Sequence, residues 1–86
     1  MQKEKIETVQ AIIALQIKKY LKGIAPSKVA AEYGISTSIM SKLVRGLKNP
    51  QFTTILQVSE ALGISATEFM HSVESNLPEG FSTIEE

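Results

Sequence analysis

The sequence predicts an all-α domain of five helices followed by a short C-terminal tail. Apolar residues recur every three or four positions along most of the chain, and glycine or proline interrupts each of these stretches. A chain of 86 residues supplies one hydrophobic core, so the helices are expected to form a single domain. We expect this domain to span residues 1–75 and an acidic, flexible tail to span residues 76–86.

The first 22 residues predict a helix with two apolar faces. Ile12 and Leu15 point about 100–160° away from the centre of the main apolar stripe. Either a partner subunit covers this second face, or a later helix of the same chain wraps round it. We favour the partner, which places Ile12 and Leu15 in a dimer interface. The main stripe consists of Ile6, Val9, Ile13, Ile17, Tyr20 and Leu21.

The next two predicted helices are short and are joined by a tight turn. Pro26 suits the first turn of the second helix, and Gly34 ends it. Ser36 caps the third helix, and Gly46 stops it. The residues expected to face inward are Val29, Ala30 and Tyr33 in the second helix, and Met40, Leu43, Val44 and Leu47 in the third.

A fourth helix is expected over residues 52–62 and a fifth over residues 66–75. Ser65 and Glu68 form a capping box at the start of the fifth helix. Met70 in that helix is interpreted as core filler. The core residues expected in the fourth helix are Phe52, Ile55, Leu56 and Leu62.

The tail after residue 75 contains Pro78, Gly80 and three glutamates, a composition typical of disorder. Phe81 and Ile84 are the exceptions, because they could dock on the fold or on a second subunit. Disorder is favoured over docking. If the tail does dock on a partner, Phe81 and Ile84 join the dimer interface.

The composition excludes several classes of function. The chain has no Cys, no Asp and a single His, so it cannot build a thiolate metal site or a Ser/His/Asp triad. No apolar run approaches the roughly 20 residues of a membrane span. We therefore expect a cytoplasmic protein that is not an enzyme, has no metal or cofactor, and does not bind membranes.

The charges are divided unevenly along the chain, although the net charge is zero. Residues 1–50 contain all nine basic residues and three glutamates, whereas residues 51–86 contain six glutamates and no basic residue. Such an asymmetry indicates one part that faces a polyanion and another part that faces a different partner.

The second and third helices together have the spacing of a DNA-reading helix-turn-helix. Ala30 provides the small residue needed where the two backbones approach, and Gly34 tolerates the positive φ of the turn. A polar outer face is common on any surface helix. The tight turn and the basic half of the chain nevertheless favour DNA binding. The outward residues of the third helix are Thr37, Ser38, Ser41, Lys42 and Arg45.

A longer string of residues, between positions 24 and 69, matches one family in a single register. It reads Val29-Ala30-x-x-x-Gly34-Ile35-Ser36, Ser41-Lys42-Leu43, Arg45-Gly46, Asn49-Pro50, Ile55-Leu56, Ala61-Leu62-Gly63-Ile64-Ser65 and Glu68-Phe69. This stretch resembles the Cro-type helix-turn-helix family, the lambda-repressor-like or xenobiotic-response-element group. The resemblance implies a five-helix bundle that binds a palindromic operator in double-stranded DNA as a homodimer.

The resemblance also implies roles for individual residues. Base contacts fall on Thr37, Ser38, Ser41 and Lys42, and phosphate contacts fall on Ser27, Lys28, Arg45, Lys48 and Asn49. The chain departs from the family pattern at four places. Ala25-Pro26 replaces the frequent Ser-Gln pair, and Val44 stands where an acidic residue is common. Ile39 stands where threonine or another polar residue is usual, and Lys18 stands where an apolar residue is usual.

Our functional hypothesis is a transcriptional regulator, of the repressor kind, that inserts the helix at residues 37–45 into the major groove as a homodimer. The alternative is an antitoxin or adaptor that binds a protein partner. That reading rests on the acidic half of the chain and on the second apolar face of the first helix.

Overall fold

Five helices form the fold in the order α1 (Lys3–Leu21), α2 (Pro26–Glu32), α3 (Thr37–Val44), α4 (Phe52–Ala61) and α5 (Ala66–Ser75). This computed structural model describes residues 2–84, and no strand occurs among them. The predicted all-α, five-helix class is therefore confirmed. Of the predicted tail, residues 85 and 86 lie outside the described part of the chain.

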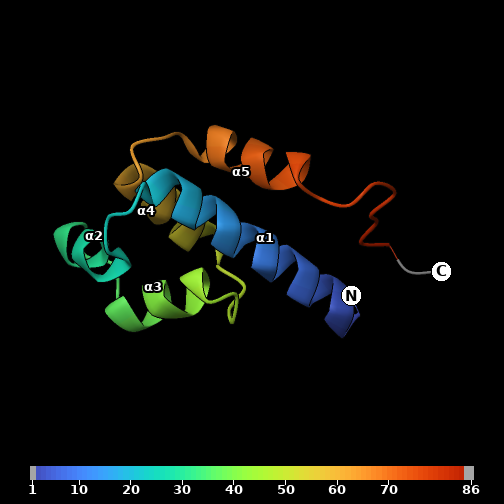
Figure 1. Cartoon of the computed structure of the whole chain (residues 1–86), viewed down its shortest axis with the longest axis horizontal. Helices are drawn as coiled ribbons and strands as arrows, with labels where there is room; N and C mark the ends of the chain where they lie inside the picture. Colours follow the sequence, from blue (N-terminus) through green and yellow to red (C-terminus); the bar gives the residue numbers. More distant parts are fainter. Residues whose placement is uncertain (1, 85–86) are drawn as a thin grey trace.

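The long helix α1 runs through the middle of the molecule, with α3 packed on one side and α5 on the other (Figure 1). Ile12 packs against the core, and Gln16, one turn later on the same face, is buried. The Ser72 hydroxyl of α5 donates a hydrogen bond to Oε1 of Gln16. Ile12 is thus partly buried within its own chain, whereas Leu15 remains 60% exposed.

The joint between α2 and α3 has the tight geometry that the sequence predicts. Ala30 is fully buried, and its carbonyl oxygen accepts a hydrogen bond of 2.9 Å from the backbone N–H of Ile35. Gly34 adopts a φ of +68°, in the left-handed region. Ser36 caps α3 as predicted, because its hydroxyl oxygen accepts a hydrogen bond of 3.3 Å from the backbone N–H of Ile39.

Replacing Gly34 by alanine is expected to lower the free energy of unfolding by about 1–2 kcal/mol. A Cβ atom at this position would meet no atom within 4 Å, so the loss comes from backbone strain alone. The matched control is Gly34→Asn, which should lose less because asparagine tolerates the left-handed region better than alanine does. Urea unfolding of the three proteins measures the difference. Equal stability of wild type and Gly34→Ala would contradict the strained-turn account.

Several apolar residues that the periodicity places in the core are exposed in the structure. The prediction of burial is wrong for Tyr33, Leu47, Phe52, Leu56 and Met70. α2 ends before Tyr33 and α3 ends before Leu47, so the helical spacing no longer orients these two side chains. Leu56 directly follows Ile55, and Met70 directly follows Phe69, and both preceding residues pack in the core. Because each residue is rotated by about 100° from the one before it, Leu56 and Met70 point away from the core. Phe52 is the first residue of α4, at the free end of that helix.

The rest of the core combines predicted residues, such as Ile17 and Met40, with two that the sequence analysis did not assign, Val58 of α4 and Val73 of α5. Ser65 caps α5 by accepting a hydrogen bond of 3.0 Å from the backbone N–H of Glu68. The buried apolar residues that hold the helices together are Ile13, Ile17, Leu21, Val29, Ala30, Ile35, Met40, Leu43, Val58, Phe69 and Val73.

Candidate nucleic-acid interface

The orientation of α3 is set by two side chains that point into the core. Met40 and Leu43 are almost completely buried, and Ile39 and Val44 pack partly against the same core. Because α3 turns about 100° per residue, its opposite side must face solvent. The structure leaves Thr37, Ser38, Lys42 and Arg45 exposed, and Ser41 half-buried at the edge of that face.

The polar side chains on this outer face are available for a ligand. Among residues 2–84, the side chains of Thr37, Ser38, Ser41, Lys42 and Arg45 make no hydrogen bond or ion pair with the rest of the chain. Together they offer three hydroxyls, an ammonium and a guanidinium. Hydroxyls can bond several base edges, and the two cations suit guanine O6 and N7 or phosphate oxygens.

The predicted phosphate-contact residues lie on both sides of α3 in the chain. Ser27 and Lys28 are exposed in the first turn of α2, which Pro26 begins. Lys48 is half-buried and Asn49 is exposed in the segment between α3 and α4. The structure thus keeps these four residues at the surface, on the elements that directly precede and follow α3.

The end of α3 is held close to α1. A Cβ atom on Gly46 would lie 3.6 Å from the Cα of Ala11, so the two backbones are nearly in contact. A hollow between α1 and α3 is lined by Ala11, Ala14, Leu15, Lys18, Val44, Arg45 and Gly46. Lys18 therefore lies on the same hollow as Arg45. The sequence analysis did not identify it as a site residue, because its proximity to α3 depends on how the two helices cross.

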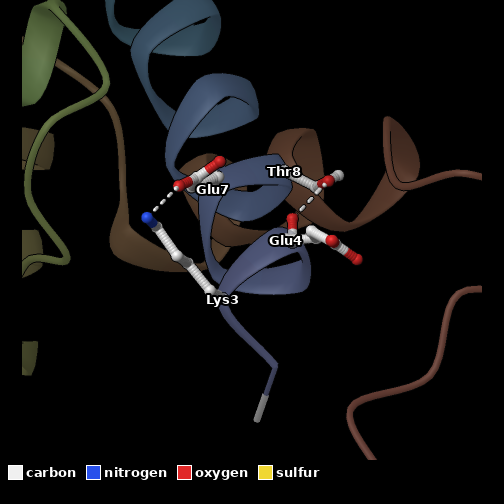
Figure 2. Close-up of polar contacts among 4 residues, drawn as sticks. All are labelled: Lys3, Glu4, Glu7 and Thr8. Carbon is white, nitrogen blue, oxygen red and sulfur yellow. Dashed lines mark hydrogen bonds and ion pairs between the residues drawn. The ribbon is translucent and has the colours of Figure 1, made fainter.

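The N-terminus of α1 carries charges that are partly compensated locally (Figure 2). Lys3 Nζ lies 3.9 Å from Glu7 Oε1, one turn along the helix, and both side chains are exposed. The Thr8 hydroxyl donates a hydrogen bond of 2.9 Å to the carbonyl oxygen of Glu4. This segment is a regular helical turn from Lys3 onward.

The four residues predicted to form a dimer interface do not share one environment. Ile12 and Phe81 are half-buried within their own chain, whereas Leu15 and Ile84 are 60% and 77% exposed. Leu15 lines the hollow between α1 and α3. Phe81 lines a different hollow, which also includes Val9 and Met70.

Two further findings concern metals and membranes. The described residues contain no group of three or more His or Glu side chains arranged to hold a metal ion. No helix within residues 2–84 has both the length and the apolar composition needed to cross a membrane.

The fold is all-α, and a tight turn joins the two short helices α2 and α3. The outward polar face lies on α3, the second helix of the pair. This arrangement defines a helix-turn-helix domain. The chain matches the helix-turn-helix family over residues 16–69, and it belongs to that family. The resemblance to Cro-type proteins is thereby confirmed.

One curated relative is the uncharacterized HTH-type transcriptional regulator y4dJ of Sinorhizobium fredii (strain NBRC 101917 / NGR234). It is 37% identical over 49 residues, which cover 57% of this chain and 64% of the relative. The match thus spans a little less than two thirds of that protein. No solved structure is significantly similar to the chain.

Proposed function

We propose that this protein is a sequence-specific DNA-binding regulator of transcription, with α3 as its recognition helix. The single observation that supports this most strongly is the outward polar face of α3, which has no side-chain partner within residues 2–84 and is oriented by the buried Met40 and Leu43. A surface that satisfied its own hydrogen bonds would have nothing to offer base edges. Membership of the helix-turn-helix family and the name of the relative support the same conclusion.

The proposed contacts divide into those that read bases and those that position the protein. Base edges would be read from the major groove by Thr37, Ser38, Ser41 and Lys42. Phosphates would be bound by Ser27, Lys28, Arg45, Lys48 and Asn49. Phosphate contacts set the register of the helix on the duplex, and base contacts supply the specificity.

The proposed regulator acts as a homodimer and as a repressor. Two copies of α3 would enter successive major grooves about 34 Å apart on one side of the duplex, which requires a palindromic operator. Bound there, the pair would block polymerase sterically. In this proposal residues 1–75 form the DNA-binding domain and residues 76–86 form a separate tail.

A second candidate function is a protein-binding antitoxin or adaptor. It is favoured by the hollow beside α5, whose apolar wall includes Met70, Leu77 and Phe81 from the acidic half of the chain and Val9 from α1. The two functions predict different effects of substitutions on the outer face of α3. DNA binding depends on the outer face of α3, whereas capture of a partner at α5 does not.

Selection from random DNA, followed by mobility-shift assays, tests the proposed function. We expect enrichment of a palindrome whose half-sites are centred about 10 base pairs, or a multiple of that spacing, apart. Failure to enrich any site at 50–100 mM salt (about the range in which phosphate contacts remain strong) would contradict it.

The salt dependence of operator binding is expected to be shallow. The proposed surface contains four cations per chain, at Lys28, Lys42, Arg45 and Lys48, so fewer than about six counterions should be released per monomer. Titrations at several salt concentrations give this number as the slope of log K against log salt. A steeper slope would show that a further basic surface, such as Lys18 on α1, also contacts the DNA.

A further inference from the structure

The hollow between α1 and α3 combines an apolar floor with two cations. Its α1 side is a single stripe of that helix, which begins at Ala11 and ends at Lys18. Leu15 and Val44 give the floor its large apolar side chains. Lys18 and Arg45 are the cations, one from each side of the hollow. Its volume of about 300 Å³ is at the lower end of the range for small-molecule sites.

Both parts of this hollow are accessible to a ligand. Leu15 is 60% exposed and Val44 is half-buried, so the chain itself leaves the floor partly uncovered. Lys18 and Arg45 are exposed, and neither side chain makes a hydrogen bond or an ion pair with another of residues 2–84. The close approach of the two backbones at Gly46 keeps both cations beside the same space.

The charges around the hollow favour an anion. No glutamate lines it, and the glutamate nearest to Lys18 along α1 is Glu7, about 16 Å away, which is paired with Lys3. Residues 8–59 contain seven basic residues and one glutamate. α5 lies on the opposite side of α1 (Figure 1). The other glutamates of the described chain are Glu4, Glu32, Glu60, Glu68, Glu74 and Glu79.

The pairing of two cations with an apolar floor distinguishes between anions. A phosphate monoester carries a charge of about −1.5 to −2 at pH 7, which matches two cations, and its oxygens can accept from both a guanidinium and an ammonium. A phosphate of the DNA backbone carries one charge. Neither that group nor free phosphate has an apolar part to place on Leu15 and Val44.

We propose that the hollow between α1 and α3 binds a small phosphate monoester that has an apolar body. Lys18 and Arg45 hold its phosphate, and Leu15 and Val44 contact its apolar part. Because the site is small and open, a ligand of about ten non-hydrogen atoms should bind with a dissociation constant of about 0.1–1 mM. This binding does not depend on DNA.

The position of the site also couples the ligand to DNA. This coupling rests on the proposed function, in which Arg45 binds a phosphate of the operator. A guanidinium that holds the ligand is not available to the DNA backbone, so the two compete. At ten times its dissociation constant, the ligand should lower operator affinity by about threefold to 11-fold. The ligand therefore acts as an inducer of the proposed repressor.

The first test is a titration without DNA, in which heteronuclear NMR follows the amide signals of Ala14, Val44 and Gly46. Phenyl phosphate should shift these signals saturably near pH 7.5. Inorganic phosphate lacks the ring and benzoate has a single charge, so each should bind at least about fivefold more weakly. Equal binding of inorganic phosphate would overturn the role of the apolar floor, and equal binding of benzoate would overturn the preference for a phosphate monoester.

Substitutions locate the site on the surface. Lys18→Gln should weaken phenyl phosphate binding at least about fivefold, and Leu15→Ser at least about threefold. The matched control is Lys19→Gln, which removes the same charge one residue later, about 100° round the helix and outside the hollow. It should change the affinity by less than about twofold. Equal losses at positions 18 and 19 would overturn the site. The amide spectra also show whether each variant folds.

The second test measures operator affinity with and without phenyl phosphate at constant ionic strength. Lys18→Gln should bind the operator as wild type does and should lose most of the response to the ligand. A weaker operator affinity of this variant alone would show that Lys18 serves the DNA backbone, and would overturn the inference. A chain that binds phenyl phosphate but selects no DNA would overturn the regulator alone. A chain that selects DNA but does not bind phenyl phosphate would overturn this inference alone.

Discussion

Charge reversal at Lys42 and Arg45 is expected to reduce operator affinity by more than about 100-fold. Each substitution removes a cation from the proposed DNA face and adds a carboxylate that the phosphates repel. Both side chains are exposed and make no ion pair among the described residues, so the fold should be unaffected. Fluorescence anisotropy with a labelled operator measures the loss in the variant Lys42→Glu, Arg45→Glu.

The control for this experiment is Lys3→Glu with Lys5→Glu, which changes the net charge by the same amount at the start of α1. It should retain affinity to within about threefold, because only long-range screened electrostatics is altered. Equal losses in the two variants would mean that binding follows net charge and not the face of α3. If the protein also has a protein partner, that interaction should survive the Lys42/Arg45 variant.

Replacing Phe69 by alanine is expected to lower the free energy of unfolding by about 3–5 kcal/mol. Phe69 is 1% exposed, and it adjoins Ile17 of α1, Leu43 of α3 and Val58 of α4 around a common point in the core. Domains of this size have total stabilities of about 5–15 kcal/mol, so the variant should be close to unfolding at 37 °C. Urea denaturation followed by circular dichroism measures the change.

The neighbouring residue provides a matched control for this cavity. Met70 is 43% exposed, so Met70→Ala should cost less than about 1 kcal/mol. Similar losses at positions 69 and 70 would be inconsistent with the observed orientation of α5. Neither Phe69 nor Met70 belongs to the proposed DNA face. Any loss of DNA binding in these two variants should therefore follow from their loss of stability.

Much of the local structure could be predicted because it depends on neighbouring residues. Ser36 and Ser65 begin helices through hydrogen bonds to backbone groups three residues away. Gly34 marks the turn because few other residues adopt its backbone conformation. The outward direction of Lys42 followed from the buried positions of Met40 and Leu43, since helix geometry relates the two faces.

Other features depend on which helix lies against which, and no local pattern contains that information. Periodicity groups residues on a face, but it does not say whether another element covers that face. Ile12 is partly buried against the core, whereas Phe52 and Leu56 have the same apolar character and remain 68% and 45% exposed among the described residues. The position of Lys18 beside Arg45 likewise depends on the crossing of α1 and α3. Short-range rules therefore specified the helices and the outward polar face of α3, and packing between distant segments determined which apolar surfaces remain exposed.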